Sequence, residues 1–581
     1  MGSGALILTT AGDAPTVGAS PLRVRWLGTV PYGEASDLQH SLFEHGRDDW
    51  LLLLEHPHVY TLGSNADPSN VLVDPASVGA ECLRTDRGGD VTYHGPGQLV
   101  GYPVLSVPGK RGGGMADTVA YVRSVEDLVI GALNDLGLSD VGRLDQYPGV
   151  WVAPESSNPR KIAAIGVRLT RGRSMHGFAI NVDPDMSMFT HIVPCGIADK
   201  SVTSLAQEGI DASMAEVVEA VVAQSTALWA SKRSVDRADI IRRSADGDED
   251  LSPFSRGAGA GLPVKTGADH RAGPSLRLQG RLAEAGVADG IDVMERKPEW
   301  MRAKVNIGGK PLELKKTLRD LQLVTVCEEA GCPNLSECWS DGTATFMING
   351  ERCTRKCGFC LVDTRLPEAL DPQEPARVAE AVARMELDFA VVTTVARDDL
   401  PDEGAGAMAD TVRAIRERVP GVQVEVLISD CRGQAAALDL IFESRPDVLN
   451  HNVETVPRLQ RAVRPSAGYA RSLAVLSRAK RAGLLTKSGL VVGMGETDEE
   501  IASVLADLAG IGVSIVTIGQ YLRPTSTHLP VDRWVTPEQF VSYAALGKEL
   551  GIDHVESSPL TRSSFHAKQA AAQSVVPVTL G

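Results

Sequence analysis

Thr343-Ala-Thr-Phe-Met-Ile348 and, five residues later, Cys353-Thr-Arg-Lys-Cys357-Gly-Phe-Cys360 open the second half of this 581-residue chain. The first run predicts a buried strand, and the second is a loop with three thiols. Further strand-like runs, each followed by a helical segment, lie at 389–395, 422–429, 447–453, 486–493 and 514–522. Six β-then-α units predict a parallel sheet with right-handed crossovers. Six is fewer than the eight of a closed barrel, so we expect an α/β fold, a partial (β/α)6 barrel, whose functional face lies at the carboxyl ends of the strands.

The first half mixes strands and helices without this regular alternation. Residues 161–169 and 174–182 predict two joined strands, and residues 117–136 predict an amphipathic helix. Ser213 and Glu216 have the spacing of a capping box at the start of another helix. The N-terminal fold class is therefore α+β.

Residues 236–287 separate the two halves and are dominated by small, polar, Gly and Pro residues, so we predict a flexible linker there. The alternative is a long surface loop inside one domain, which is uncommon at this length. The expected division is an N-terminal tail over 1–22, one domain over 23–235, the linker, and a second domain over 288–581.

Composition restricts the classes of partner. The formal net charge is −16, which disfavours general binding to nucleic acid or to anionic membranes. No apolar run approaches 18 residues, and no basic residue precedes Arg23, so neither a membrane span nor a secretory signal is expected. We expect a cytoplasmic protein.

Six of the nine cysteines form two triplets, and clustering of this kind indicates metal binding rather than disulfides. The triplets are Cys327, Cys332 and Cys338, and Cys353, Cys357 and Cys360. Three thiolates can hold three irons of a [4Fe–4S] cluster and leave the fourth iron open. Structural zinc usually takes four ligands from paired C-x2-C knuckles, and only Cys357 and Cys360 have that spacing. A zinc-binding scaffold without catalytic activity stays open as an alternative.

The second triplet, C-x3-C-x2-C, resembles that of the radical S-adenosylmethionine superfamily. The preceding C-x4-C-x5-C narrows the resemblance to the lipoyl synthase family over about 290–575. Further matching motifs are Arg296-Lys-Pro-Glu-Trp-Met301, Arg397-Asp-Asp-Leu400, His451-Asn-Val-Glu-Thr455, Gly493-Met-Gly-Glu-Thr497 and Arg562-Ser-Ser564.

That resemblance implies two [4Fe–4S] clusters and S-adenosylmethionine. Cys353, Cys357 and Cys360 would hold one cluster. The implied ligands of the other cluster are Cys327, Cys332, Cys338 and Ser564. The implied S-adenosylmethionine contacts are Asn452, Glu454, Gly493 and Gly495. The chain departs from the family at Glu403, where a glycine is usual.

In the first half, Cys195 lies in a Pro-Cys-Gly turn. A lone cysteine is usually a small buried apolar residue. A nucleophilic cysteine instead needs a lowered pKa, which a nearby cation supplies most often, and Lys161 is the candidate.

Residues 87–98, 161–166, 176–181 and 194–196 together resemble the octanoyltransferase of lipoate biosynthesis over about 23–230, a fold shared with biotin and lipoate protein ligases. The resemblance makes Cys195 the nucleophile and has Lys161 lower the Cys195 pKa. The implied acyl-pocket residues are Arg87, Gly88, Gly89, Asp90, Val91, Thr92, Tyr93, His94, Ala164, Ile165, Gly166, Gly177, Phe178 and Ala179.

Both resemblances together predict a bifunctional enzyme of lipoate biosynthesis. It would move octanoyl from acyl carrier protein to a lysine of a lipoyl domain, and then insert sulfur at C6 and C8. The implied partners are octanoyl-acyl carrier protein, lipoyl domains of 2-oxoacid dehydrogenase complexes, the H protein of glycine cleavage, and a reduced donor such as flavodoxin or ferredoxin. We hypothesise that the linker favours handover between the two sites.

An alternative keeps the enzyme class but changes the chemistry: an ATP-dependent lipoate or biotin-type ligase fused to another sulfur-inserting radical enzyme. Such a ligase does not need the Cys195 thiol, so Cys195→Ser separates the two hypotheses. Anaerobic purification tests the zinc scaffold, because iron with acid-labile sulfide excludes zinc alone.

Overall fold

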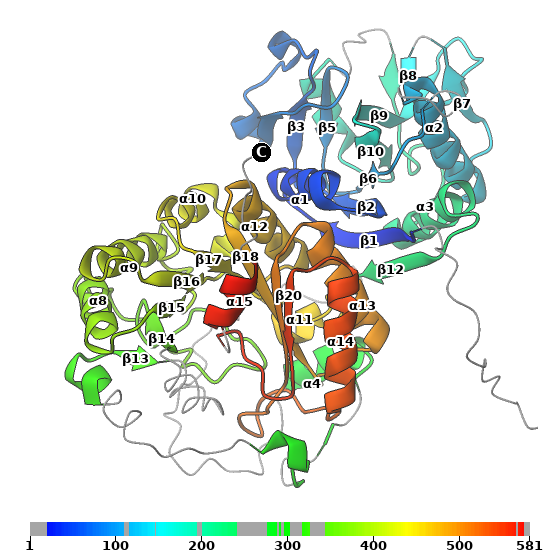
Figure 1. The fold of residues 1–581 in the computed structure, drawn as a ribbon. Coiled ribbons are helices and arrows are strands. Elements are labelled where there is room, and N and C mark those ends of the chain that lie inside the picture. Colours follow the sequence, from blue (N-terminus) through cyan, green and yellow to red (C-terminus); the bar gives the residue numbers. More distant parts are fainter. Residues whose placement is uncertain are drawn as a thin grey trace, which may run out of the picture.

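The computed structural model describes residues 20–109, 116–145, 147–193, 200–240, 276–287, 290–291, 295–302, 316–325, 343–564 and 567–574. Two bodies lie against each other (Figure 1). The first is built from residues before 241 and the second from residues after 275. None of the described helices is long and apolar enough to cross a bilayer.

The first body contains a nine-stranded mixed sheet in the order β12-β1-β2-β6-β10-β9-β8-β7, with β11 paired to β9. Its strands are β1 (Leu22–Thr29), β2 (Asp49–Glu55), β6 (Gln98–Val104), β7 (Val141–Leu144), β8 (Tyr147–Val152), β9 (Arg160–Thr170), β10 (Arg173–Asn181), β11 (Ser201–Val202) and β12 (Val235–Asp239). A second sheet, in the order β4-β3-β5, holds β3 (Val59–Leu62), β4 (Glu81–Arg84) and β5 (Val91–His94).

Three helices accompany these sheets: α1 (Tyr32–His45), α2 (Thr118–Asp135) and α3 (Met214–Trp229). The expected capping box is present at the start of α3, where Ser213 and Glu216 each accept from the other's backbone N–H. The expected hairpin is formed by β9 and β10, and its turn places Arg171 and Gly172 at positive φ. The α+β prediction is confirmed.

The second body is an open barrel. Seven parallel strands run in chain order, from β14 (Thr343–Ile348) through β15 (Phe389–Thr394), β16 (Gln423–Leu427), β17 (Val448–Asn450), β18 (Leu485–Val492) and β19 (Ile515–Gln520) to β20 (His554–Ser557). The antiparallel β13 (Val324–Thr325) pairs with β14. The partial barrel is confirmed with one more strand than predicted. Its last strand escaped the sequence analysis because His554-Val-Glu-Ser557 is short and mostly polar.

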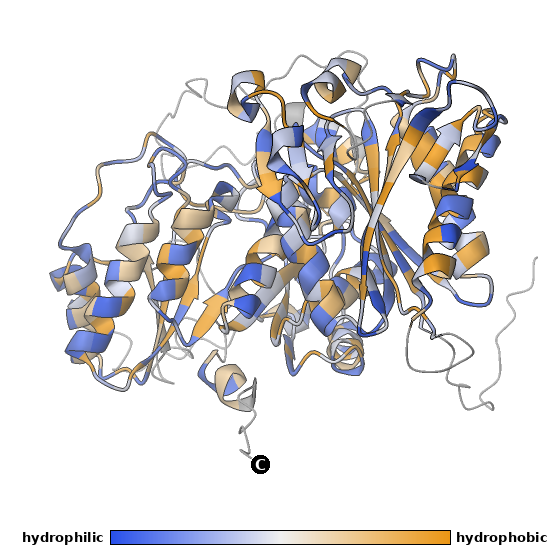
Figure 2. Cartoon of the chain, turned by 90° about the horizontal axis from the view of Figure 1, so that it is seen from above, coloured by the Kyte–Doolittle hydropathy of each residue, from blue (hydrophilic) through white to orange (hydrophobic). Residues whose placement is uncertain are grey.

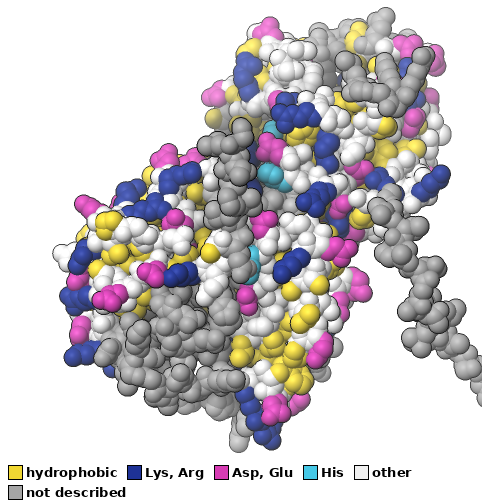
Figure 3. Space-filling view, in the orientation of Figure 1, with side chains coloured by type: hydrophobic (Ala, Val, Ile, Leu, Met, Phe, Trp, Pro, Cys, Tyr) yellow, Lys and Arg dark blue, Asp and Glu magenta, His cyan; other side chains and the backbone are white. Residues whose placement is uncertain are grey.

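The outer helices of the barrel are α8 (Glu374–Arg384), α9 (Ala405–Arg418), α10 (Ala435–Glu443), α12 (Tyr469–Arg481), α13 (Asp498–Gly510) and α14 (Pro537–Glu549). Shorter elements are α4 (Leu276–Glu284), α11 (Gln460–Val463) and α15 (Ala567–Ser574). Hydrophobic residues are frequent on the strands, while the helices carry both hydrophobic and hydrophilic residues (Figure 2). Acidic and basic side chains are interspersed on the face seen in Figure 3.

The predicted linker over 236–287 is wrong at both ends. Residues 235–239 form β12, which pairs in parallel with β1, and residues 276–284 form α4. The polar residues of β12 suggested a loop, yet they have ionic partners: Arg237 pairs with Glu219 and Asp239. Residues 241–275 lie outside the described part of the chain.

A buried ion pair inside the barrel links two strands across β17. The Lys487 ammonium on β18 donates to both carboxylate oxygens of Glu425 on β16, at 2.9 and 3.0 Å, and Asn450 donates to the same carboxylate. Both charged side chains are 0% exposed. Removing one partner leaves the other charge buried without compensation.

We therefore expect Glu425→Gln to lower the free energy of unfolding by about 3 kcal/mol, measured by urea denaturation. The control is Asp410→Asn, which breaks the exposed Asp410–Arg413 pair of α9 and should cost under about 1 kcal/mol. Equal small losses for both variants would contradict the role given to the buried pair.

Candidate functional site

The three-cysteine loop begins directly after β14 and is anchored to the carboxyl ends of several other strands. Its backbone N–H groups at Cys353, Thr354 and Gly358 donate to the carbonyls of Asp363, Ala396 and Val463, at 2.8, 3.0 and 2.8 Å. In addition, Ala396 N–H donates to the Cys353 sulfur at 3.3 Å. The loop therefore lies at the edge of the sheet where the barrel was expected to function.

Arg355 is the main side-chain anchor of this loop. Its guanidinium pairs with Asp398 at 2.7 Å and with Asp430 at 2.6 Å, and the arginine is 7% exposed. Asp398 follows β15 and Asp430 follows β16. One buried cation between two cysteines thus ties the loop to two neighbouring strand ends.

The thiols of this loop interact electrostatically with each other. Burial raises the pKa of Cys357 to about 12 and that of Cys360 to about 11, and the neighbouring cysteines contribute in the same direction. Burial also raises the pKa of Cys353. Among the described residues, no three His, Cys, Asp or Glu side chains converge closely enough to chelate a single metal ion. A four-iron cluster differs, because each thiolate binds a separate iron.

Asn452 and Glu454 follow β17 and lie beside the cysteine loop. Arg464 donates to the carbonyls of Asn452 and Val453 at 2.9 and 3.2 Å, which fixes this turn. The Asn452 amide donates to Glu454 at 3.1 Å, while its Oδ1 is buried and lacks a partner among the described residues. Glu454 has a φ of 65°, and burial raises its pKa. This turn offers polar groups that a bound ligand can satisfy.

Gly493 and Gly495 were expected to let a ligand approach the backbone. Both have positive φ, 97° and 113°. A Cβ at Gly493 would lie 2.1 Å from the Gln520 side chain, and a Cβ at Gly495 would lie 2.6 Å from Val287. Close packing against the protein therefore accounts for these two glycines without a ligand.

Glu403, the departure from the family pattern, occupies a left-handed position with φ of 57°. Its carboxylate accepts from Arg432 at 2.7 Å and from Gln434 at 2.8 Å. Burial raises its pKa. Two hydrogen bonds thus stabilise Glu403 in a backbone conformation that glycine adopts more easily.

Of the predicted ligands of the second cluster, Cys327, Cys332 and Cys338 lie outside the described residues. Ser564 is described and lies in a partly buried turn. The segment leading to it crosses β19, since a Cβ at Gly519 would lie 2.0 Å from the Thr561 carbonyl oxygen.

The first body contains a cavity between β10, β9 and the loop before β5. Of the fourteen predicted acyl-pocket residues, twelve line it: Arg87, Gly88, Gly89, Asp90, Thr92, His94, Ala164, Ile165, Gly166, Gly177, Phe178 and Ala179. The other two, Val91 and Tyr93, pack instead into a small separate core with Tyr60. They alternate with Thr92 and His94 along β5, so they face the opposite side of the strand.

Several polar side chains line this cavity. Arg87 donates to the Thr61 carbonyl at 2.6 Å and to the Thr61 hydroxyl, and is 7% exposed. His94 is hydrogen-bonded to Gln98 at 2.6 Å. Burial lowers the pKa of His94 to about 3 and that of the nearby His56 to about 4, so both rings are neutral at pH 7.

Lys161 lies on β9, three residues before the cavity-lining Ala164. It is 7% exposed, and its ammonium lies 5.0 Å from the centre of the Trp151 ring. Cys195 lies outside the described residues. The chain resumes at 200, and Val202 of β11 pairs with Lys161. The described residues Ser201 and Val202 therefore run alongside Arg160 and Lys161 of β9.

Sequence reasoning missed several residues of both sites. The cavity is also lined by Tyr32, Val100, Tyr102 and His176. The His176 ring is hydrogen-bonded to Asp86 at 2.6 Å, and this bond lowers the Asp86 pKa. In the barrel, Arg355 lies inside the cysteine motif and Asp398 lies inside Arg397-Asp-Asp-Leu400. The sequence identified both motifs but did not indicate a role for these two residues.

Different family models match the first and the second body. Residues 31–226 match the family model of the lipoyl protein ligase A/B catalytic domain. Residues 285–332 match the N-terminal domain of lipoyl synthase of the radical SAM family, and residues 347–508 match the radical SAM superfamily.

Curated relatives cover the second body. Lipoyl synthase of Rubrobacter xylanophilus is 56% identical over 275 residues, 47% of this chain and 86% of that protein. Lipoyl synthase of Mycolicibacterium paratuberculosis is 53% identical over 292 residues, 50% of this chain and 93% of that protein. A putative lipoate protein ligase from T. acidophilum, a solved structure, is 19% identical and covers 38% of this chain and 90% of its own, with a TM-score of 0.32.

The low pKa of His94 makes the first body sensitive to acid. The folded-state pKa lies below the ordinary value of 6.5, so the neutral ring stabilises the fold above that pH, and the contribution is lost as the pH falls from 6.5 toward 3. We expect His94→Gln to reduce the slope of unfolding free energy against pH between 6.5 and 4.5 by up to about 1.4 kcal/mol per pH unit.

Urea denaturation at several pH values measures this slope. The control is His58→Gln, because His58 is only partly buried. An unchanged slope in His94→Gln would contradict a buried neutral ring.

Proposed function

The chain belongs to the lipoyl synthase family through its second body, and from that premise we propose that its first body is an octanoyltransferase that prepares the substrate for sulfur insertion. The observation that carries the proposal is the cavity of the first body. Its lining combines small residues, among them Ala164, Gly166 and Ala179, with polar side chains such as Arg87 and His94. Such a lining suits an acyl chain with a polar head.

The residues of the barrel rim suit an iron–sulfur cluster and S-adenosylmethionine. Cys353, Cys357 and Cys360 supply soft thiolate donors on one anchored loop, the ligand type that iron–sulfur clusters prefer. Beside them, Asn452 Oδ1 is buried and unsatisfied among the described residues, so a ligand with N–H groups would satisfy it.

We assign the rim triad to one [4Fe–4S] cluster and Cys327, Cys332, Cys338 and Ser564 to a second. Asn452 and Glu454 would contact S-adenosylmethionine. Gly493 and Gly495 would shape the rim backbone beside it. When bound, these groups supply the radical abstraction of hydrogen and the sulfur that unactivated carbons C6 and C8 require. The chain's own part is to position the octanoyl group and exclude water.

Acyl transfer in the first body proceeds in two balanced steps. The Cys195 thiolate attacks the thioester carbonyl of octanoyl-acyl carrier protein; a new C–S bond to Cys195 forms, the C–S bond to the carrier breaks, and the carrier thiolate takes up the proton that the Cys195 thiol had released. The ε-amine of a lipoyl-domain lysine then attacks the Cys195 thioester. The amide bond forms, the C–S bond breaks, and the amine's proton passes to the Cys195 sulfur. The Lys161 ammonium would stabilise the thiolate in both steps.

The partners follow from this sequence of reactions. They are octanoyl-acyl carrier protein, the lipoyl domains of 2-oxoacid dehydrogenases and the glycine-cleavage H protein, and a reduced flavodoxin or ferredoxin. The cytoplasm provides all of them.

An anaerobic assay tests both reactions at once. The enzyme is incubated with octanoyl-acyl carrier protein, apo lipoyl domain, S-adenosylmethionine and a reductant, and the lipoyl domain is weighed by mass spectrometry. Cys195→Ser should leave the domain unmodified, while Cys357→Ala should stop it at the octanoyl form. If Cys195→Ser still loads octanoate with ATP, the first body is a ligase and the proposal fails.

The cavity also predicts chain-length selectivity. Ala179 pairs with Ala164 across β9 and β10 and both residues line the cavity, so Ala179→Leu reduces the space inside it. We expect kcat/KM for octanoyl transfer to fall at least tenfold, and for butanoyl transfer less than threefold, because each methylene is worth about 1 kcal/mol or more in an apolar pocket.

The control is Ala223→Leu, the same substitution on the exposed side of α3. Equal losses for both chain lengths in Ala179→Leu would place the acyl chain elsewhere.

A further inference from the structure

The outer surface of α12 and α13 is covered by the first body, with α1, β1 and β12 against it (Figure 1). We propose that this α12–α13 face is a docking surface for the acyltransferase body, which holds the two bodies together without the linker. The inference holds whatever acyl group the first body transfers.

A buried ionic network crosses the interface. Arg25 of β1 donates to Asp507 of α13 at 2.7 Å, and the two side chains are 2% and 3% exposed. The hydroxyl of Tyr469 donates to the other oxygen of Asp507 at 2.7 Å. Arg25 also pairs with Asp236 of β12, at 2.8 Å, and Ser503 of α13 donates to Asp236. Burying such charges costs free energy that only the matched partner offsets, so the network selects one docked geometry.

Glycines of the barrel leave space that side chains of the first body fill. A Cβ at Gly510 would lie 2.6 Å from the Trp50 ring, and one at Gly512 would lie 2.8 Å from His45. Likewise, a Cβ at Gly551 would lie 3.1 Å from the Arg47 guanidinium. This fit is of the close-packed kind found inside domains.

Apolar packing and charge are also complementary across the interface. One buried cluster contains Leu38, Leu42 and Trp50 of the first body together with Leu473, Val504 and Leu508 of the second. Around it, acidic residues of α1 meet basic residues of α12: Glu34 pairs with Arg471 at 2.8 Å, and Asp37 pairs with Arg481 and Arg478. A surface this apolar would otherwise be exposed to water.

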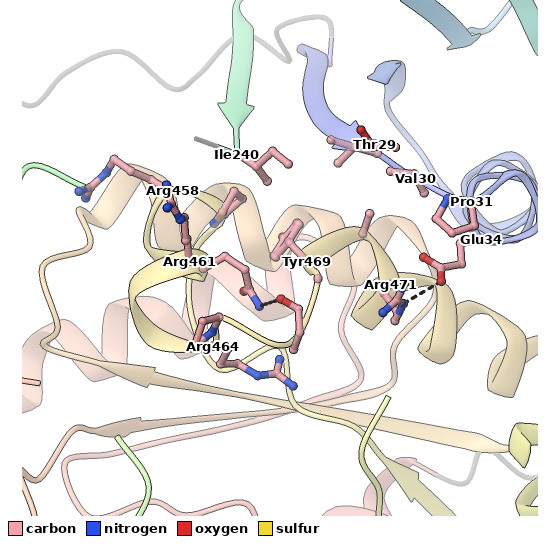
Figure 4. A pocket seen from close by; sticks show the side chains of 17 residues that line it. Thr29, Val30, Pro31, Glu34, Ile240, Arg458, Arg461, Arg464, Tyr469 and Arg471 are labelled. Atoms are coloured by element: carbon pink, nitrogen blue, oxygen red, sulfur yellow. Dashed lines mark hydrogen bonds and ion pairs between the residues drawn. The ribbon is translucent and has the colours of Figure 1, made fainter. Parts of the chain in front are cut away.

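At one edge the interface opens into a cavity between the β1–α1 turn and the loop before α12 (Figure 4). The Glu34–Arg471 pair lies at its side, and Arg464 is at its floor. Arg464 also donates to the Asn452 carbonyl, so one side chain connects this cavity between the bodies to the rim turn. Fixed docking, rather than linker length, then sets the separation of the two sites.

The test uses the full chain with a protease site introduced within 241–275. After cleavage of the purified protein, we expect both fragments to elute as one complex in size-exclusion chromatography at micromolar concentration, with unchanged flux from octanoyl-acyl carrier protein to lipoyl product. Two separate peaks would overturn the proposal.

A steric variant probes the assigned face. Gly510→Leu should separate the cleaved fragments, or raise their Kd at least tenfold, because the atoms nearest to an added Cβ belong to Trp50 and Leu42 of the other body. Leucine favours helix over glycine, so α13 itself is not weakened. The control, Gly280→Leu in α4, has no atom within 4 Å of the added Cβ and should stay associated. Association of Gly510→Leu equal to the control would overturn the assignment.

A charge swap tests the same docking surface if Gly510→Leu fails to fold. Arg481 is 40% exposed, so Arg481→Glu leaves the core intact. We expect about a three- to tenfold weaker association of the cleaved fragments at low salt, and recovery when Asp37→Arg is added. If the double variant binds no better than Arg481→Glu, these residues do not face each other in solution and the docked geometry is wrong.

Discussion

Arg355, buried between Asp398 and Asp430, is the interaction on which the barrel site depends. It stands between the first two cysteines of the rim loop and binds carboxylates that follow two different strands. In a parallel sheet the carboxyl ends of the strands lie at one edge, and this guanidinium fixes the loop with its three thiols at that edge. Arg464 acts in the same way on the Asn452 turn. Both cations therefore connect the barrel architecture to its chemistry.

Periodicity predicted the barrel well because its strands are buried apolar runs and its helices are amphipathic. It missed β20, where only Val555 is buried and apolar. It also placed β12 in the linker, because Asp236, Arg237 and Asp239 look like loop residues until their ionic partners are known. Asp236 pairs with Arg25 and Arg237 pairs with Glu219. These partners lie outside β12, so the local sequence pattern does not predict the ion pairs.

The sites were predicted mostly through motifs. Twelve acyl-pocket residues line one cavity, yet Val91 and Tyr93 do not, since strand alternation turns them away. His176, Tyr32 and Tyr102 come from separate elements, and only the fold brings them together. The docking of the two bodies was likewise invisible, because Gly510 and Trp50 carry no signal of contact in sequence. A long linker suggested independent domains, whereas the packing forms one continuous interface.

We propose that the rim triad holds a four-iron cluster with one iron open to S-adenosylmethionine. Electron paramagnetic resonance of the reduced protein, with Cys327, Cys332 and Cys338 replaced by alanine, measures this directly. We expect a [4Fe–4S]⁺ signal whose g values shift when S-adenosylmethionine is added. A protein that contains zinc without iron, or a cluster signal that S-adenosylmethionine leaves unchanged, would contradict it.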